Sequence, residues 1–168
     1  VCRKLTRSIN YTILNNISSQ GTCLNITNNN INIDGNRYTI NYSMTLTGHG
    51  IYGNGYNQTT IKNTTIELNN ITSKSSKGIY FLNSENQNIS YNTLKIQGHP
   101  TTDAFDHGIE LENTEDSFIF GDNISTNNQK GYGIFLLAAN GEVSSRNKLI
   151  NNRLQKIEAR VTSQIINN

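Results

Sequence analysis

Pairs of apolar residues five positions apart recur along this chain and limit what it can fold into. Each pair encloses polar residues, and the five pairs are Ile26/Ile31, Ile61/Ile66, Ile89/Leu94, Ile119/Ile124 and Leu149/Leu154. Residues five apart point to opposite faces of a flat strand, and they match one face of a helix poorly. Both members can face one core only if a sharp bend lies between them.

A second signal has nearly the same period. Gly-Ile begins at positions 50, 78, 108 and 133, and periods of 20–50 residues are typical of solenoids. The abundant Asn, Thr, Ser and Gly form helices poorly, which favours short strands and turns. An Asn-rich disordered tract is the alternative, but the low charge and regular Ile spacing argue against it.

These patterns predict an all-β fold, namely a single-stranded right-handed parallel β-helix with about five coils of three short strands. We expect one domain over 1–168, with 1–20 as an N-terminal cap and 21–168 as coils. A left-handed residue would make each bend, because Asn and Asp tolerate that conformation best after Gly. The residues expected there are Asn29, Asn92, Asp122 and Asn152, with Thr64 as the exception.

The opening of the chain resembles the first coils of right-handed parallel β-helix surface proteins of the pectin-lyase-like and NosD-like group, which are frequent in archaea and some bacteria. The matching pieces are the first Cys, Tyr11 and Leu14, Gly21 to Cys23, and Asn32 to Asn36. The Asn-bend repeats extend the resemblance over nearly the whole chain. It implies the fold rather than an activity, because this fold carries lyases, hydrolases, epimerases, adhesins and scaffolds.

Candidate catalytic residues are few. The segment "GHPTTDAFDHGIE" contains Asp103, Asp106 and His107, which could perform acid–base hydrolysis, but we favour a polar loop between two coils as their explanation. "GHG" at 48–50 is similar to a motif of pectin-degrading glycosidases, but the Asp pair of that family is absent here. The acidic "ELENTED" segment has no Lys or Arg near it in sequence. We therefore predict no catalytic site and keep a polysaccharide-active enzyme or a carbohydrate-binding module as alternatives.

Composition excludes several partners. The net charge is +2 without a basic run, and no apolar stretch is long enough to span a membrane, so neither nucleic-acid binding nor a membrane span is expected. One Met and three scattered His predict no metal site and no cofactor. Cys2 and Cys23 form no CxxC pair, and we expect a disulfide between them rather than two unrelated thiols.

Nine Asn-x-Ser/Thr sequons suggest an extracellular or cell-surface location. We expect glycans at these positions, although Asn-Ile-Thr is also a sequence that suits the strands and turns of a β-helix without any glycan. The sequons begin at Asn10, Asn16, Asn25, Asn41, Asn57, Asn63, Asn70, Asn88 and Asn123. Five of them read Asn-Ile-Ser/Thr, and alternation along a strand turns those Asn toward solvent.

Alternation also turns a possible interface outward. The apolar residues Tyr80, Leu82, Phe135 and Leu137 would form a stripe around two glutamates, and such patches often mark contacts. We expect the chain to bind copies of itself head-to-tail, through this stripe or through the C-terminal coil around "QIINN", unless further coils follow it. The sequence thus predicts a non-catalytic extracellular β-solenoid that serves as a structural unit of a surface layer, adhesin or filament.

Overall fold

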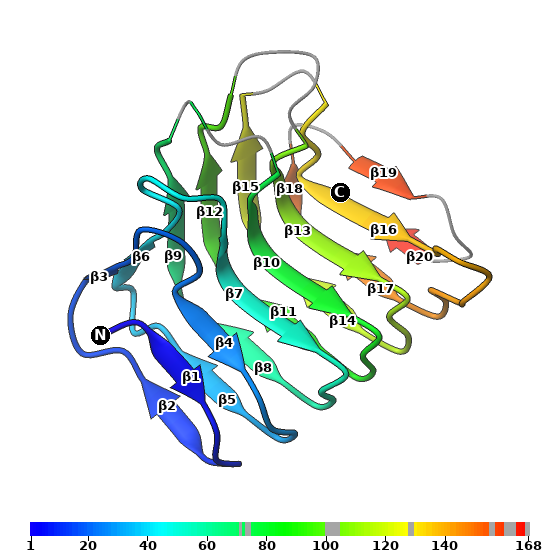
Figure 1. Cartoon of the computed structure of the whole chain (residues 1–168). Helices are drawn as coiled ribbons and strands as arrows, with labels where there is room; N and C mark the ends of the chain where they lie inside the picture. The colour runs from blue at the N-terminus through cyan, green and yellow to red at the C-terminus, as the bar shows by residue number, and fades with distance from the viewer. Residues whose placement is uncertain are drawn as a thin grey trace.

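The computed structural model describes residues 1–70, 72, 75–99, 105–127, 130–154, 157–159 and 164–166, with side chains described up to 154. Its strands form three parallel sheets (Figure 1). The first sheet contains β1(Arg3–Leu5), β4(Leu24–Ile26), β7(His49–Asn54), β10(Lys77–Leu82), β13(His107–Glu112), β16(Ile134–Leu137) and β19(Ile157–Ala159). The second contains β2(Asn10–Thr12), β5(Asn32–Asp34), β8(Thr60–Lys62), β11(Asn88–Ser90), β14(Phe118–Phe120), β17(Lys148–Ile150) and β20(Gln164–Ile166). The third contains β3(Ile17–Ser18), β6(Thr39–Asn41), β9(Thr65–Leu68), β12(Thr93–Ile96), β15(Asn123–Thr126) and β18(Arg153–Leu154).

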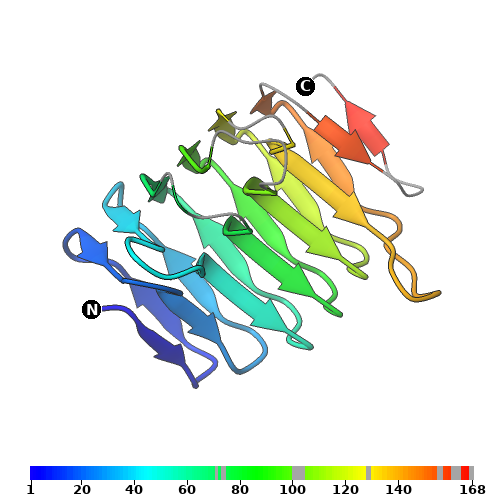
Figure 2. The same cartoon turned by 45° about the horizontal axis from the view of Figure 1, so that its top comes forward.

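The chain visits the three sheets in turn, so it is a right-handed parallel β-helix with three short strands per coil, as predicted. Figure 2 shows the coils stacked along one axis, with the N-terminal coil at one end. The described strands make six complete coils and two strands of a seventh, against about five expected. The difference arises because residues 1–20 form β1, β2 and β3 of the first coil rather than a separate cap.

The core is a set of apolar columns, one residue per coil. Ile61, Ile89, Ile119 and Leu149 are in register in the second sheet, and all are fully buried. The second members of the pairs form a matching column in the third sheet. The predicted stacking of the five-apart pairs is therefore confirmed for four of the five.

The pair Ile26/Ile31 does not belong to these columns. Ile26 lies in the first sheet on β4, whereas Ile33 and Ile40 occupy the two column positions in the second coil. Four residues separate β5 from β6, so the column residues are seven apart in that coil. The spacing rule fails there because the corner is longer.

From the third coil onward, two residues make the corner between the second and third sheets. The first of the two has a positive φ, and these residues are Asn63, Tyr91, Gly121 and Asn151. The expectation of a left-handed bend was right, but the position was wrong by one residue. Four of the predicted bend residues, Thr64, Asn92, Asp122 and Asn152, instead follow the left-handed residue and are buried, whereas Asn29 is exposed and precedes the left-handed Asn30.

The Gly-Ile repeat has a steric cause. Its Ile residues stack in register in the first sheet, and Gly50, Gly78 and Gly108 each lie against the backbone of the next coil. A Cβ atom on Gly78 would lie 2.6 Å from the carbonyl oxygen of Gly108, and one on Gly50 would lie 2.5 Å from that of Gly78. Such contacts are too close for any side chain, so the coils can stack here only with glycine.

The predicted disulfide is confirmed. Cys2 and Cys23 are bonded, with Cα atoms 4.5 Å apart, and they connect the first coil to the second. Within the part of the chain that the structure describes, no helix is long and apolar enough to cross a membrane.

Candidate functional site

The outer face of the first sheet carries a continuous series of ring-bearing and charged side chains that stack from coil to coil. Strand register places Tyr52, Tyr80, Glu110 and Phe135 in one row. His49, Lys77 and His107 form a second row beside it. We call this surface the ring face; it comprises His49, Tyr52, Lys77, Tyr80, Leu82, His107, Glu110, Glu112, Tyr132, Phe135 and Leu137.

One cluster of rings lies at the N-terminal end of the ring face. The His49 ring is 5.3 Å from that of Tyr52 and 5.1 Å from that of Tyr80, and the two tyrosines are 5.4 Å apart. The Lys77 backbone N–H donates to Nδ1 of His49 at 3.2 Å. Burial is the main cause that lowers the pKa of His49 to about 4, and the positive charge of Lys77 contributes to the same decrease. The imidazole is therefore neutral at physiological pH.

A charged pair occupies the centre of the face. The Lys77 Nζ lies 3.5 Å from Oε2 of Glu110, and Nε2 of His107 lies 3.6 Å from the same oxygen. Burial raises the pKa of Glu110, while Lys77 lowers it and Glu112 adds a further rise. The Glu110 side chain is 7 % exposed and that of Lys77 is 12 % exposed, so the pair is largely shielded from water by the rings around it.

Glu112 is bound from the neighbouring coil. The Tyr80 hydroxyl donates to Oε2 of Glu112 at 2.5 Å. Burial raises the pKa of Tyr80, and the bond to Glu112 raises it further. Both carboxylates of the ring face therefore already interact with side chains of the coil below.

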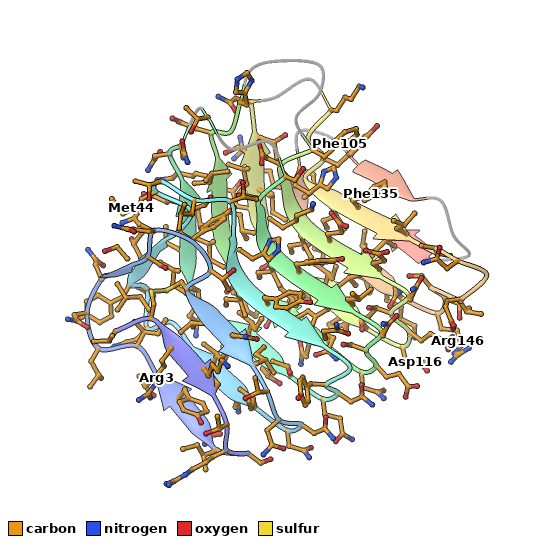
Figure 3. All side chains as sticks on the ribbon, viewed as in Figure 1. Arg3, Met44, Phe105, Asp116, Phe135 and Arg146 are labelled. Carbon is orange, nitrogen blue, oxygen red and sulfur yellow. A yellow bond between two sulfur atoms is a disulfide. The ribbon has the colours of Figure 1, made fainter. Side chains whose placement is uncertain are left out.

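A second ring cluster follows at the C-terminal side of Glu110. The His107 ring is 4.7 Å from Phe135 and 5.4 Å from Tyr132, and Tyr132 and Phe135 stack at 5.5 Å. The Tyr132 backbone N–H donates to Nδ1 of His107 at 3.0 Å, which repeats the arrangement around His49. Figure 3 shows Phe135 on the outer side of the first sheet. All four residues of the predicted apolar stripe face outward and are half-buried.

The candidate catalytic trio does not form a site among the described residues. Asp103 lies outside them. Asp106 is buried, with Oδ1 accepting from the Ser76 backbone N–H at 2.7 Å and Oδ2 from that of His99 at 3.3 Å. His107 belongs to the ring face, so Asp106 and His107 have different surroundings. Asp106 thus connects the turns of neighbouring coils, which agrees with the loop interpretation.

The acidic "ELENTED" segment divides between two places. Glu110 and Glu112 belong to the ring face, whereas Glu115 and Asp116 bind Arg146 from the next coil. Figure 3 shows Asp116 and Arg146 together at the edge of the molecule. A search for cations near this segment in the sequence did not find Lys77 and Arg146, because each binds its carboxylate from another coil. The repeat length was the signal that could have found them.

The sequons differ in exposure. Asn10, Asn16, Asn88 and Asn123 are exposed, and Asn25, Asn41, Asn57 and Asn63 are partly exposed. Asn70 is buried, and its Nδ2, the atom that would carry a sugar, donates to the Ser43 carbonyl at 2.7 Å. We therefore remove Asn70 from the expected glycan acceptors.

Comparison with known proteins gives one family. A search of curated proteins and a search of solved structures each found no match. The family model described as periplasmic copper-binding protein (NosD) matches residues 53–168, which is more than half of the chain and includes the ring face from β10 onward. Together with the stacked parallel coils, this match shows that the chain belongs to the NosD family of β-helix proteins.

Proposed function

We propose that this chain is a non-catalytic β-solenoid that works outside the cytoplasm, as a structural unit of a cell-surface layer, adhesin or filament. The observation that carries the proposal is the ring face, whose acids and imidazoles already bind groups of neighbouring coils. Such a face is suited to contact rather than to proton transfer. The Cys2–Cys23 disulfide and the periplasmic description of the family support a location outside the cytoplasm.

Copper, which the family description names, does not fit the described residues. Both cysteines are in the disulfide, and no group of three or more His, Cys, Asp or Glu among those residues could hold a metal ion. His49 and His107 lie on either side of Lys77 in strand register, about 9.6 Å apart from two strand spacings. The Nδ1 atom of each imidazole already accepts a backbone N–H, from Lys77 for His49 and from Tyr132 for His107. We derive no role through copper.

The ring face is the surface we propose for binding a second copy. Wild-type protein is expected to sediment as an oligomer at high concentration, and the Tyr80→Ser, Phe135→Ser double variant as a monomer, because both half-buried rings would be lost from the contact. A Met44→Ser, Leu46→Ser variant is the control, since these exposed apolar residues lie on a turn outside the ring face. A monomeric wild type would contradict this contact.

A polysaccharide assay tests the non-catalytic part separately. Wild type is expected to release no oligosaccharide from uronate polymers. Release that is lost on Glu112→Gln would establish the enzyme alternative, because Glu112 is the half-buried acid on the ring face.

Glycosylation is proposed for the exposed sequons. Intact mass of protein from its native source is expected to show several glycans, with Asn25, Asn88 and Asn123 as the main carriers, because these side chains face solvent at least partly. Replacing the three with Gln should remove most of the added mass, whereas Asn70→Gln should leave it unchanged. An unmodified native mass would exclude the proposal.

A further inference from the structure

The corner between the second and third sheets contains an internal ladder of polar side chains. Thr64, Asn92, Asp122 and Asn152 stack there, one per coil from the third to the sixth, and all are buried. Each side-chain Oδ1 accepts the backbone N–H of the rung before it: Thr64 N to Asn92 at 3.0 Å, Asn92 N to Asp122 at 2.6 Å, and Asp122 N to Asn152 at 2.9 Å.

The two asparagines also donate. Asn92 Nδ2 donates to the carbonyl of Ile61 at 3.2 Å, and Asn152 Nδ2 donates to the carbonyl of Ile119 at 3.0 Å. Each amide therefore accepts with its oxygen and donates with its nitrogen, and Nδ2 of Asn92 also donates to Oδ1 of Asp122 at 3.0 Å. This double use is why an amide suits the position.

Asp122 has an oxygen where its neighbours have an amide nitrogen. Its Oδ2 is buried and has no hydrogen-bond partner. The repeat places the carbonyl of Ile89, in register between Ile61 and Ile119, in the position that the amide would address. A carboxylate there would set a buried negative charge against an acceptor, whereas a carboxylic acid can donate as the amide does.

We infer that Asp122 is a neutral carboxylic acid in the folded solenoid and serves as an acid-dependent rung between the fourth and sixth coils. The groups that face it are the amides of Asn92 and Asn152 and the apolar column, none of which titrates. Burial raises the pKa of Asp122 to about 7, and the two hydrogen bonds from Asn92 only partly oppose that rise. The folded solenoid should therefore be more stable against unfolding at acidic than at alkaline pH.

The direction in which stability changes with pH follows from proton binding in the folded and unfolded states. The folded pKa of about 7 lies above the ordinary Asp value of about 3.9, so the folded chain binds more protons between these values. Stability contributed by the neutral acid is complete below about pH 4 and is lost as pH rises through about 7. The unfolding equilibrium constant should increase by up to about a thousand-fold across this range from Asp122 alone.

Matched variants isolate this group. Urea unfolding from pH 4 to 9 is expected to show that Asp122→Asn equals wild type near pH 4 and exceeds it in stability above pH 7, because an amide completes the ladder at every pH. Asn152→Asp is the reverse variant, and it should acquire an additional loss of stability toward alkaline pH. Parallel pH profiles for wild type and Asp122→Asn would overturn the inference.

Infrared spectroscopy of the folded wild type tests the protonation state directly. Folded wild type at pH 6 should show a carbonyl band from a protonated carboxyl that disappears by pH 9 and is absent in Asp122→Asn. The absence of this band in wild type would overturn the inference as well.

Discussion

Replacing Ile119 with Ala is expected to lower the free energy of unfolding by about 2–5 kcal/mol. Ile119 is fully buried between Ile89 and Leu149 in the core column, and both neighbours are held in strand register. Neither coil can move toward the other to fill the space, because hydrogen bonds of three sheets fix their spacing. Urea unfolding followed by circular dichroism measures the loss.

Asn88→Ala is the matched control for this experiment. Asn88 lies on β11 next to Ile89, but its side chain is exposed, so the change in stability should stay within about 0.5 kcal/mol. A loss below about 1 kcal/mol for Ile119→Ala would mean that burial in this column contributes little to the free energy of unfolding.

Removing the disulfide should have an effect of similar size. Cys2 and Cys23 are 21 residues apart in sequence, and a bond that closes a loop of this length stabilises a protein by about 3 kcal/mol in the chain-entropy model. The Cys2→Ser, Cys23→Ser double variant should lose that amount. Reduction of wild type should reproduce the loss, since it removes the same bond.

The loss should also be local. The first coil has strands of three, three and two residues, and its described pairings reach only the second coil. Hydrogen exchange should therefore accelerate in β1, β2 and β3 before it does in the middle coils. Uniform acceleration along the whole chain would contradict this role of the disulfide.

The core could be predicted from sequence because each inward position repeats chemically. Ile or Leu returns at the same place in each coil, so spacing alone revealed the columns and the bend. The failures occurred where one coil departs from the repeat. The pair Ile26/Ile31 fits the spacing by chance, while the longer corner after β5 moves the true column residues to Ile33 and Ile40.

The ring face was harder to predict because its contacts connect different residue types. The Lys77–Glu110 and Arg146–Asp116 pairs join residues of neighbouring coils, which a search along the sequence does not bring together. The exposure of the sequons was also difficult to predict from the sequence. Alternation counted from Ile71 placed Asn70 at the surface, but Asn70 continues the inward positions of Ile66 and Leu68, and its side chain donates to the Ser43 carbonyl.

The corners of the coil differ in how far they tolerate insertions. The corner between the second and third sheets keeps two residues from the third coil onward, whereas eight residues separate β9 from β10 and ten separate β12 from β13. One residue added to the short corner would reverse the inward and outward positions of the following strand. We expect the long corner to accept grafted peptides without that cost, so that foreign sequences could be displayed at the interval of one coil along the solenoid.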